Sequence, residues 1–250
     1  MKKTLLALLI LGAITVLQAP PAHAQDLTLD EAQYDLGLGL YISGRFEYSI
    51  EEFRFMVDRY PASPYLVDAQ YWLAMSFFSM QDYTNATLAF LDVMQQHPDS
   101  PVYRLSLYYL SQCFYKRNMM SDAKLRFNEF VSRYPNDDLA DNSLFWTGVI
   151  TWKEGRDDAA VAVFNRQLNR YPTGNKAEAA KYMKLLITGG GTKKPTQEEL
   201  DRIKSLEDWE NLLQAKEAAL NSKEVLNNTK EKGLEEKQRQ VEDAASKVLK

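Results

Sequence analysis

The sequence has 250 residues, 45% of them hydrophobic, and a formal net charge of −4, so it is long enough to bury a sizeable core. Without a basic excess it is a poor candidate for binding nucleic acid or an anionic membrane surface, since both require clustered positive charge. A single cysteine excludes a disulfide framework.

The first 24 residues have the pattern of a secretory signal peptide. Lys2 and Lys3 precede an apolar run over residues 5–17, and a small-residue pattern ends at Ala24, which is typical of a signal-peptidase site. We expect cleavage after Ala24, export and a periplasmic location. The alternative, an uncleaved anchor, is disfavoured because the apolar run is too short to span a bilayer. No cysteine lies near the junction, so we expect no lipid anchor.

After the expected signal peptide, an aromatic-proline pair recurs every 37 residues. The pairs are Tyr60-Pro61, His97-Pro98, Tyr134-Pro135 and Tyr171-Pro172. Seven residues before each pair stands a phenylalanine, and four residues before that a small residue: Phe53, Phe90, Phe127 and Phe164, with Ser49, Ala86, Ala123 and Ala160. A fixed period of this length is the signature of a repeat protein.

Each repeat is predicted to be a helical hairpin, because apolar residues recur three to four apart on both sides of a turn position. Gly and Asn favour the left-handed conformation that closes a helix, and this position holds Gly44, Gln81, Asn118 and Gly155. The prolines end the second helix of each hairpin. The expected N-caps of the next helices are Ser63, Ser100, Asp137 and Gly174.

The order and spacing of small, aromatic and proline positions resemble the tetratricopeptide-repeat family over about residues 28–187. The resemblance implies an all-α, right-handed superhelical solenoid of four 37-residue hairpins plus a capping helix at about 175–187. The aromatic-Pro-x-Ser junction resembles the periplasmic branch of the family, which includes an outer-membrane-protein assembly lipoprotein and the coordinator of the Tol-Pal system. Unlike the first, the chain has no cysteine at the signal-peptide junction, and unlike the second, which has a coiled coil before its repeats, its long charged helix follows them.

The same resemblance implies that the fifth and twelfth positions of each repeat face a concave groove, counting from Asp30, Val67, Arg104 and Asp141 as position 1. All eight of these positions are aromatic: Tyr34, Tyr41, Tyr71, Phe78, Tyr108, Tyr115, Phe145 and Trp152. Two aromatic rows of this kind are suited to binding a peptide or helix of a partner protein. The alternative is that they fill the core between neighbouring repeats. The recurring phenylalanines are predicted to be core.

The tail after the repeats divides into two parts. Residues 188–195 are rich in glycine and predict a flexible linker. Residues 196–250 predict a charged helix with one leucine and valine stripe in a seven-residue register. This segment holds 13 acidic and 10 basic residues. It also lacks the second apolar stripe of a strict coiled-coil dimer. Three roles stay open: weak self-association as a coiled coil, docking on another protein or on the solenoid, and a solvated spacer.

Chemistry-bearing residues are few in the exported chain. His97 replaces the tyrosine of a repeat junction, and Cys113 lies in an apolar stretch. We expect a buried thiol, with intermolecular pairing as the alternative, no metal, no cofactor and no catalytic site.

The sequence therefore predicts a non-enzymatic adaptor of the bacterial cell envelope that binds other envelope proteins. The alternative is a structural subunit of a large envelope or motor-associated assembly, built by repeat stacking and the C-terminal helix. A small-molecule binding role is the third hypothesis, and it would need a closed pocket.

Overall fold

The computed structural model describes residues 28–189 and Arg239. Every regular element within 28–189 is an α-helix. The expected signal peptide (1–24), all but the start of the expected linker (188–195) and the expected C-terminal helix (196–250), Arg239 apart, lie outside the described residues. The helices are α1 (Leu29–Ile42), α2 (Phe46–Arg59), α3 (Leu66–Ser79), α4 (Tyr83–Gln96), α5 (Val102–Lys116), α6 (Met120–Arg133), α7 (Asp138–Lys153), α8 (Asp157–Arg170) and α9 (Ala177–Thr188).

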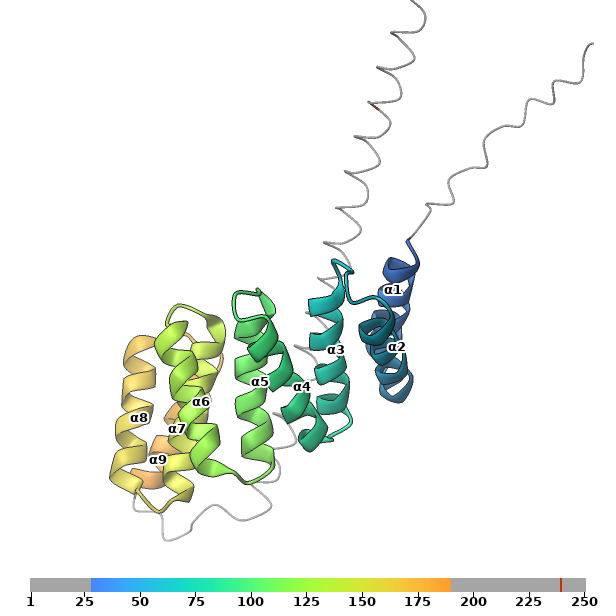
Figure 1. Ribbon diagram of the computed structural model, residues 1–250. Helices are drawn as coiled ribbons and strands as arrows, with labels where there is room; N and C mark the ends of the chain where they lie inside the picture. The colour runs from blue at the N-terminus through green and yellow to red at the C-terminus, as the bar shows by residue number, and fades with distance from the viewer. Residues whose placement is uncertain (1–27, 190–238, 240–250) are drawn as a thin grey trace, which may run out of the picture.

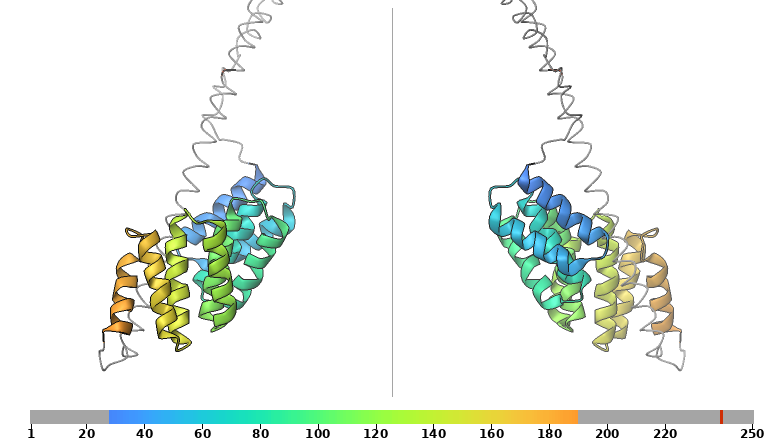
Figure 2. Two further views of the ribbon diagram at one scale, coloured as in Figure 1. Left: turned by 90° about the vertical axis from the view of Figure 1, so that its left-hand side faces the viewer. Right: turned by 90° about the vertical axis from the view of Figure 1, so that its right-hand side faces the viewer.

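Consecutive helices pack against one another as a stack of hairpins (Figure 1). α1 with α2, α3 with α4, α5 with α6 and α7 with α8 form the four expected hairpins, and each second helix also contacts the next hairpin. We call α1, α3, α5 and α7 the first helices and α2, α4, α6 and α8 the second helices. Figure 2 shows α1 and α9 at opposite ends of the stack. The predicted solenoid with a capping helix is confirmed.

The turn inside each hairpin depends on one residue with a positive φ angle. Gly44 (78°), Gln81 (63°), Asn118 (62°) and Gly155 (74°) all adopt the left-handed conformation. Its backbone reverses the chain after a first helix, and non-glycine residues enter it only at some cost in free energy. The predicted turn position is thus confirmed in all four repeats.

The junctions between repeats follow the prolines as predicted, because every second helix ends one residue before the aromatic-proline pair. The N-cap predictions are only partly right. Asp137 caps α7, and its carboxylate accepts a hydrogen bond from Leu139 N at 2.9 Å. Ser63 accepts one from Tyr65 N at 3.1 Å, but α3 begins later, at Leu66, so Ser63 stabilises the preceding turn instead.

Small residues at the eighth position of each repeat let the two helices of a hairpin approach closely: Gly37, Ala74, Ser111 and Gly148. A Cβ atom added to Gly37 would lie 2.8 Å from the ring of Phe53, and one added to Gly148 would lie 2.5 Å from Phe164. Both rings are fully buried, so they have no room to move away. The small residue and the phenylalanine therefore act as a pair, which explains why they recur together.

No helix in the described part of the chain is both long and apolar enough to span a bilayer.

Candidate functional site

The fifth-position rings pack inside their own repeats. Each lies against the recurring phenylalanine of its second helix, and none is more than 4% exposed. The ring-centroid distances are 6.1 Å for Tyr34–Phe53, 6.2 Å for Tyr71–Phe90, 6.1 Å for Tyr108–Phe127 and 6.0 Å for Phe145–Phe164. The expectation that this row lies open along a groove is therefore wrong, because the rings form the core of each hairpin.

The twelfth-position rings join one repeat to the next. Their partners are aromatic residues at the sixth position of the following repeat, with centroid distances of 5.1 Å for Tyr41–Trp72, 5.3 Å for Phe78–Tyr109 and 4.5 Å for Tyr115–Trp146. Tyr41 is fully buried, and its hydroxyl is 3.0 Å from the Ser79 hydroxyl, so its expected exposure is also wrong. Phe78, Tyr115 and Trp152 are only partly buried. Partner binding by these three stays a prediction.

A cavity of about 440 Å³ opens between the first helices. No second helix contributes to its lining. α3, α5 and α7 supply Tyr71, Arg104, Leu105, Tyr109, Asp138 and Leu139, and the loops before α7 and α9 supply Asn136, Asp137 and Asn175. The cavity is therefore built from the surface on which the sequence predicted a binding groove.

Two tyrosines of the lining keep their hydroxyl groups unpaired within the described structure. Tyr71 is 2% exposed and Tyr109 is 4% exposed, yet neither hydroxyl has a hydrogen-bond partner among the described residues. Phe90 packs 6.2 Å from the ring of Tyr71 and 6.1 Å from that of Tyr109, and so fixes both. Neither hydroxyl oxygen is among the fully buried, unpartnered side-chain atoms of the described residues. Both tyrosines line the cavity, so their hydroxyls are available to hydrogen-bond a ligand there.

The charged groups of the cavity largely neutralise one another. Arg104 forms an ion pair with Asp137, whose other carboxylate oxygen caps α7. Asp138 is exposed at the start of the same helix. Burial raises the pKa of both Tyr71 and Tyr109 well above the usual tyrosine range, so both phenols stay protonated and neutral at physiological pH.

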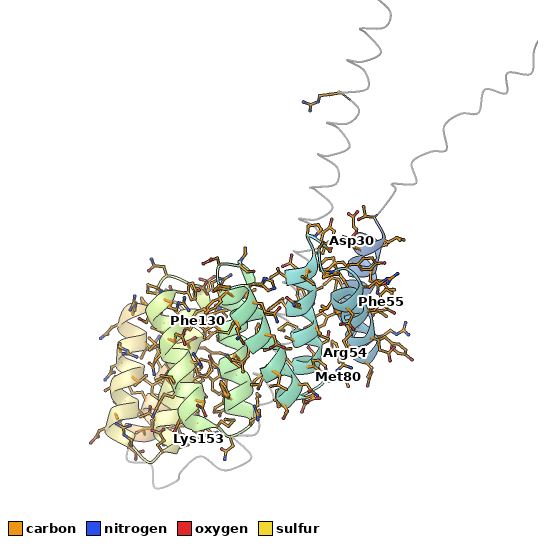
Figure 3. All side chains as sticks on the ribbon, in the orientation of Figure 1. Asp30, Arg54, Phe55, Met80, Phe130 and Lys153 are labelled. Atoms are coloured by element: carbon orange, nitrogen blue, oxygen red, sulfur yellow. The ribbon has the colours of Figure 1, made fainter. Side chains whose placement is uncertain are left out.

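Some first helices carry acidic residues at one edge of the stack, and others carry basic residues at the opposite edge. Asp30 and Asp68 lie in the first turns of α1 and α3, whereas Lys116 and Lys153 lie in the last turns of α5 and α7. Figure 3 shows Asp30 at one edge of the stack and Lys153 at the other. This arrangement complements the helix macrodipoles, and it gives the first-helix surface a polarity.

Comparisons with known proteins place this geometry among repeat proteins. The model of the outer membrane lipoprotein family YfiO matches residues 28–137, which hold the first three hairpins. A search of curated proteins found no match. One similar solved structure is a tetratricopeptide repeat protein from Parabacteroides merdae (12% identity, TM-score 0.55), with 64% of this chain covered and 60% of that one. This chain thus spans less than two thirds of that protein's length.

Two further solved structures are similar over more of their own length. YrrB, described as a TPR protein with an unusual peptide-binding site, is 13% identical with a TM-score of 0.52, over 63% of this chain and 76% of that one. PilF from Pseudomonas aeruginosa is 14% identical with a TM-score of 0.51, over 74% and 75%. This chain has the tetratricopeptide-repeat fold.

The tetratricopeptide pattern located only part of the cavity. Of the eight predicted binding residues, only Tyr71 lines it. Tyr109 was missed because the pattern directs attention to positions five and twelve, whereas Tyr109 is at position six. A signal was present in the sequence: position six is aromatic in repeats two to four, at Trp72, Tyr109 and Trp146, but is Asp35 in the first repeat. The sixth position packs against a twelfth-position ring only where another repeat precedes it, and no repeat precedes Asp35.

The two residues with reactive side chains, Cys113 and His97, pack against or lie close to other parts of the solenoid. Cys113 is fully buried, and burial raises the pKa of its thiol far above the usual range, which suppresses the reactive thiolate. His97 Nε2 is 2.8 Å from the side-chain oxygen of Gln70. Among the described residues, no group of three or more His, Cys, Asp or Glu side chains is placed to hold a metal ion.

Proposed function

We propose that this chain is an exported, non-enzymatic adaptor of the bacterial cell envelope that binds a peptide segment of a partner protein on its first helices. The observation that carries the proposal is the cavity between α3, α5 and α7, lined by Tyr71 and Tyr109, whose hydroxyls have no hydrogen-bond partner among the described residues. Polar groups in such a setting are suited to orienting a ligand. The match to an outer membrane lipoprotein family supports the envelope location, together with the signal-peptide pattern of residues 1–24.

The contact residues of this adaptor are four of the eight that the repeat pattern predicted, together with Tyr109. Tyr71 and Tyr109 bind at the bottom of the cavity, and the partly exposed rings of Phe78, Tyr115 and Trp152 extend the surface along the stack. The remaining predicted residues hold the repeats together: Tyr34, Tyr41, Tyr108 and Phe145. The acidic and basic edges favour a partner segment whose own charges lie in the complementary order.

We expect the double variant Tyr71→Phe with Tyr109→Phe to recover about tenfold less partner from solubilised envelope than the unchanged chain. Each substitution removes one hydroxyl and keeps the buried ring, so the loss reflects hydrogen bonds worth roughly 0.5–1.5 kcal/mol each. Affinity capture followed by quantitative mass spectrometry measures the yield. Tyr34→Phe is the matched control, because Tyr34 occupies the same repeat position as Tyr71 outside the cavity. Equal recovery by the double variant and the control would contradict the proposal.

A second function is favoured by the two ends of the stack, which both expose apolar side chains. Leu29 and Leu36 on α1 are 77% and 50% exposed, and Tyr182 and Leu185 on α9 are 43% and 66% exposed. Leu185 stands at the eighth position, where the complete repeats have a small residue that accommodates phenylalanine. Such ends suit a structural subunit whose copies stack end to end, since a head-to-tail contact repeats without closing.

If this second function holds, the purified chain forms larger species as its concentration rises, and either Leu36→Glu or Leu185→Glu abolishes them. A carboxylate buried in an apolar contact is strongly unfavourable. Sedimentation velocity measures the size distribution. Leu125→Glu is the control, because Leu125 is 62% exposed but lies on α6, away from both ends. A single small species at all concentrations, or equal effects of all three variants, would rule out end-to-end stacking.

A further inference from the structure

The chemistry of the cavity between α3, α5 and α7 defines the kind of group that it binds. We propose that Tyr71 and Tyr109 together bind a neutral amide group of the partner polypeptide, as found in an Asn or Gln side chain or in the peptide backbone. This inference rests on the adaptor function proposed above and goes further, because it names the ligand chemistry of the site.

The two phenols line the same cavity and can both act as donors to a ligand in it. Tyr71 comes from α3 and Tyr109 from the next first helix, α5, and Phe90 packs against both rings at 6.2 and 6.1 Å. Tyr71 also packs edge-on against Trp72 at 5.0 Å, and Tyr109 against Tyr108 at 5.4 Å. Because the rings are held on two sides, the positions of both hydroxyl oxygens are fixed, while each O–H bond can rotate toward an acceptor. A carbonyl oxygen, with two lone pairs, can accept a hydrogen bond from each.

The charge of the cavity selects against an ionic ligand. Arg104 is paired with Asp137, so a ligand carboxylate would have to compete with an existing ion pair and would also meet Asp138. A ligand ammonium group would meet the guanidinium of Arg104. A carboxylate would lose hydration without gaining a free counter-charge. An ammonium group could pair only with Asp138, whose exposed position makes such an ion pair weak. A neutral acceptor avoids both penalties.

The rim of the cavity complements the other half of an amide. Asn136 and Asn175 line it from the loops before α7 and α9, beside the carboxylate of Asp138. Side-chain oxygens of Asn and Asp accept hydrogen bonds from N–H groups. The tyrosine donors are buried, whereas Asn136, Asp138 and Asn175 are exposed. This order matches an amide with its C=O directed inward and its N–H directed outward. The volume of about 440 Å³ is within the usual range for small-ligand sites, and it suits a side chain with its flanking backbone.

The test uses four blocked amino acids as probes of the full chain: the N-acetyl N-methylamides of glutamine, methionine, glutamate and lysine. NMR line broadening and chemical-shift titration detect binding as weak as the millimolar range. We expect the glutamine probe to bind more tightly than the glutamate and lysine probes. The methionine probe has a side chain of similar length without the amide. If the ligand group is a side-chain amide, the methionine probe will bind less tightly than the glutamine probe. If the ligand group is the backbone amide, the two probes will bind equally tightly.

The same titration with Tyr71→Phe and Tyr109→Phe, singly and together, tests the two donors. We expect affinity for the amide probe to fall about tenfold in the double variant, with an intermediate loss in each single variant. Tyr34→Phe should bind as tightly as the unchanged chain. Unchanged affinity in the double variant, or tighter binding of the glutamate or lysine probe, would overturn the amide assignment.

The two proposals fail in distinguishable ways. If the double variant loses its captured partner but the glutamine and methionine probes do not bind the unchanged chain, the adaptor function stands and the amide assignment is wrong. If the probes bind in the expected order but partner capture is unchanged, the cavity binds amides and the adaptor function is wrong at this site.

Discussion

Replacing Phe90 by Ala is expected to lower the free energy of unfolding by about 3–5 kcal/mol, the range seen for large-to-small substitutions in well-packed cores. Phe90 is fully buried and packs against Tyr71 and Tyr109, so the substitution removes apolar burial and leaves a cavity between two repeats. The effect should reach the binding site as well, because both tyrosine rings lose their common support.

Urea unfolding followed by circular dichroism measures this loss. Leu88→Ala is the control on the same helix, because Leu88 is 57% exposed, and its effect should stay within about 0.5 kcal/mol. Stacked repeats can unfold in segments. The hydrogen exchange rates of backbone amides in α3 to α5 should therefore rise more than those in α7 to α9. Equal effects of Phe90→Ala and Leu88→Ala would contradict the placement of Phe90 in the core.

Tyr71→Ala should destabilise the chain almost as much as Phe90→Ala, because Tyr71 is also buried and packs on Phe90. A groove residue that only touched a partner would not show this behaviour. Removing the whole side chain therefore cannot separate binding from stability at this position. Tyr71→Phe can, since it deletes only the hydroxyl.

The fold was predictable from the sequence because each turn, helix end and close helix contact restricts the residue types at a few nearby positions. A positive φ angle at Gly44 and at the corresponding positions requires residues that tolerate it. The prolines that follow each second helix are incompatible with its continuation. The close approach of Gly148 and Phe164 requires a small residue opposite a large one. These demands recur every 37 residues, so the hairpins could be placed before any tertiary contact was known.

The candidate site was much less predictable, because a period identifies residues on one helix face but does not say what lies against that face. Tyr34 and Tyr108 belong to the same stripe as Tyr71, yet of these three only Tyr71 lines the cavity. Only Tyr71 lines the cavity because the lining is assembled from three separate first helices and two loops, which the pattern within one helix does not show. Arg104 and Asp137 are 33 positions apart, and nothing local in the sequence indicates that they pair.

Asp141→Ala is expected to lower the free energy of unfolding by about 2–4 kcal/mol, although an aspartate in the first turn of a helix is usually an exposed charge. Asp141 is only 2% exposed. One oxygen accepts a hydrogen bond from Gln167 Nε2 at 2.7 Å, and the other from the backbone N–H of Lys176 at 2.6 Å. The carboxylate thereby links α7 to α8 and to the loop before α9. Removing it leaves two buried donors without acceptors, each worth roughly 1–3 kcal/mol.

The backbone around Asp141 is built to bring these donors close. A Cβ atom added to Gly174 would lie 2.4 Å from the carboxylate, so only glycine lets the loop pass at this distance. Asp141→Asn should restore only part of the lost stability, because an amide presents one acceptor oxygen where the site has two donors. The remaining donor would then face an NH₂ group.

Thermal and urea unfolding of Asp141→Ala, Asp141→Asn and Asp158→Ala provide the comparison. Asp158 is exposed in the first turn of α8, so its loss should alter stability by less than about 1 kcal/mol through the helix dipole. Because Asp141 anchors the loop that leads into α9, its removal should also raise the hydrogen exchange rate of α9 much more than that of α3. If Asp141→Ala were no more destabilising than Asp158→Ala, α9 would be held to the stack by its apolar contacts alone, through Ala180 and Met183.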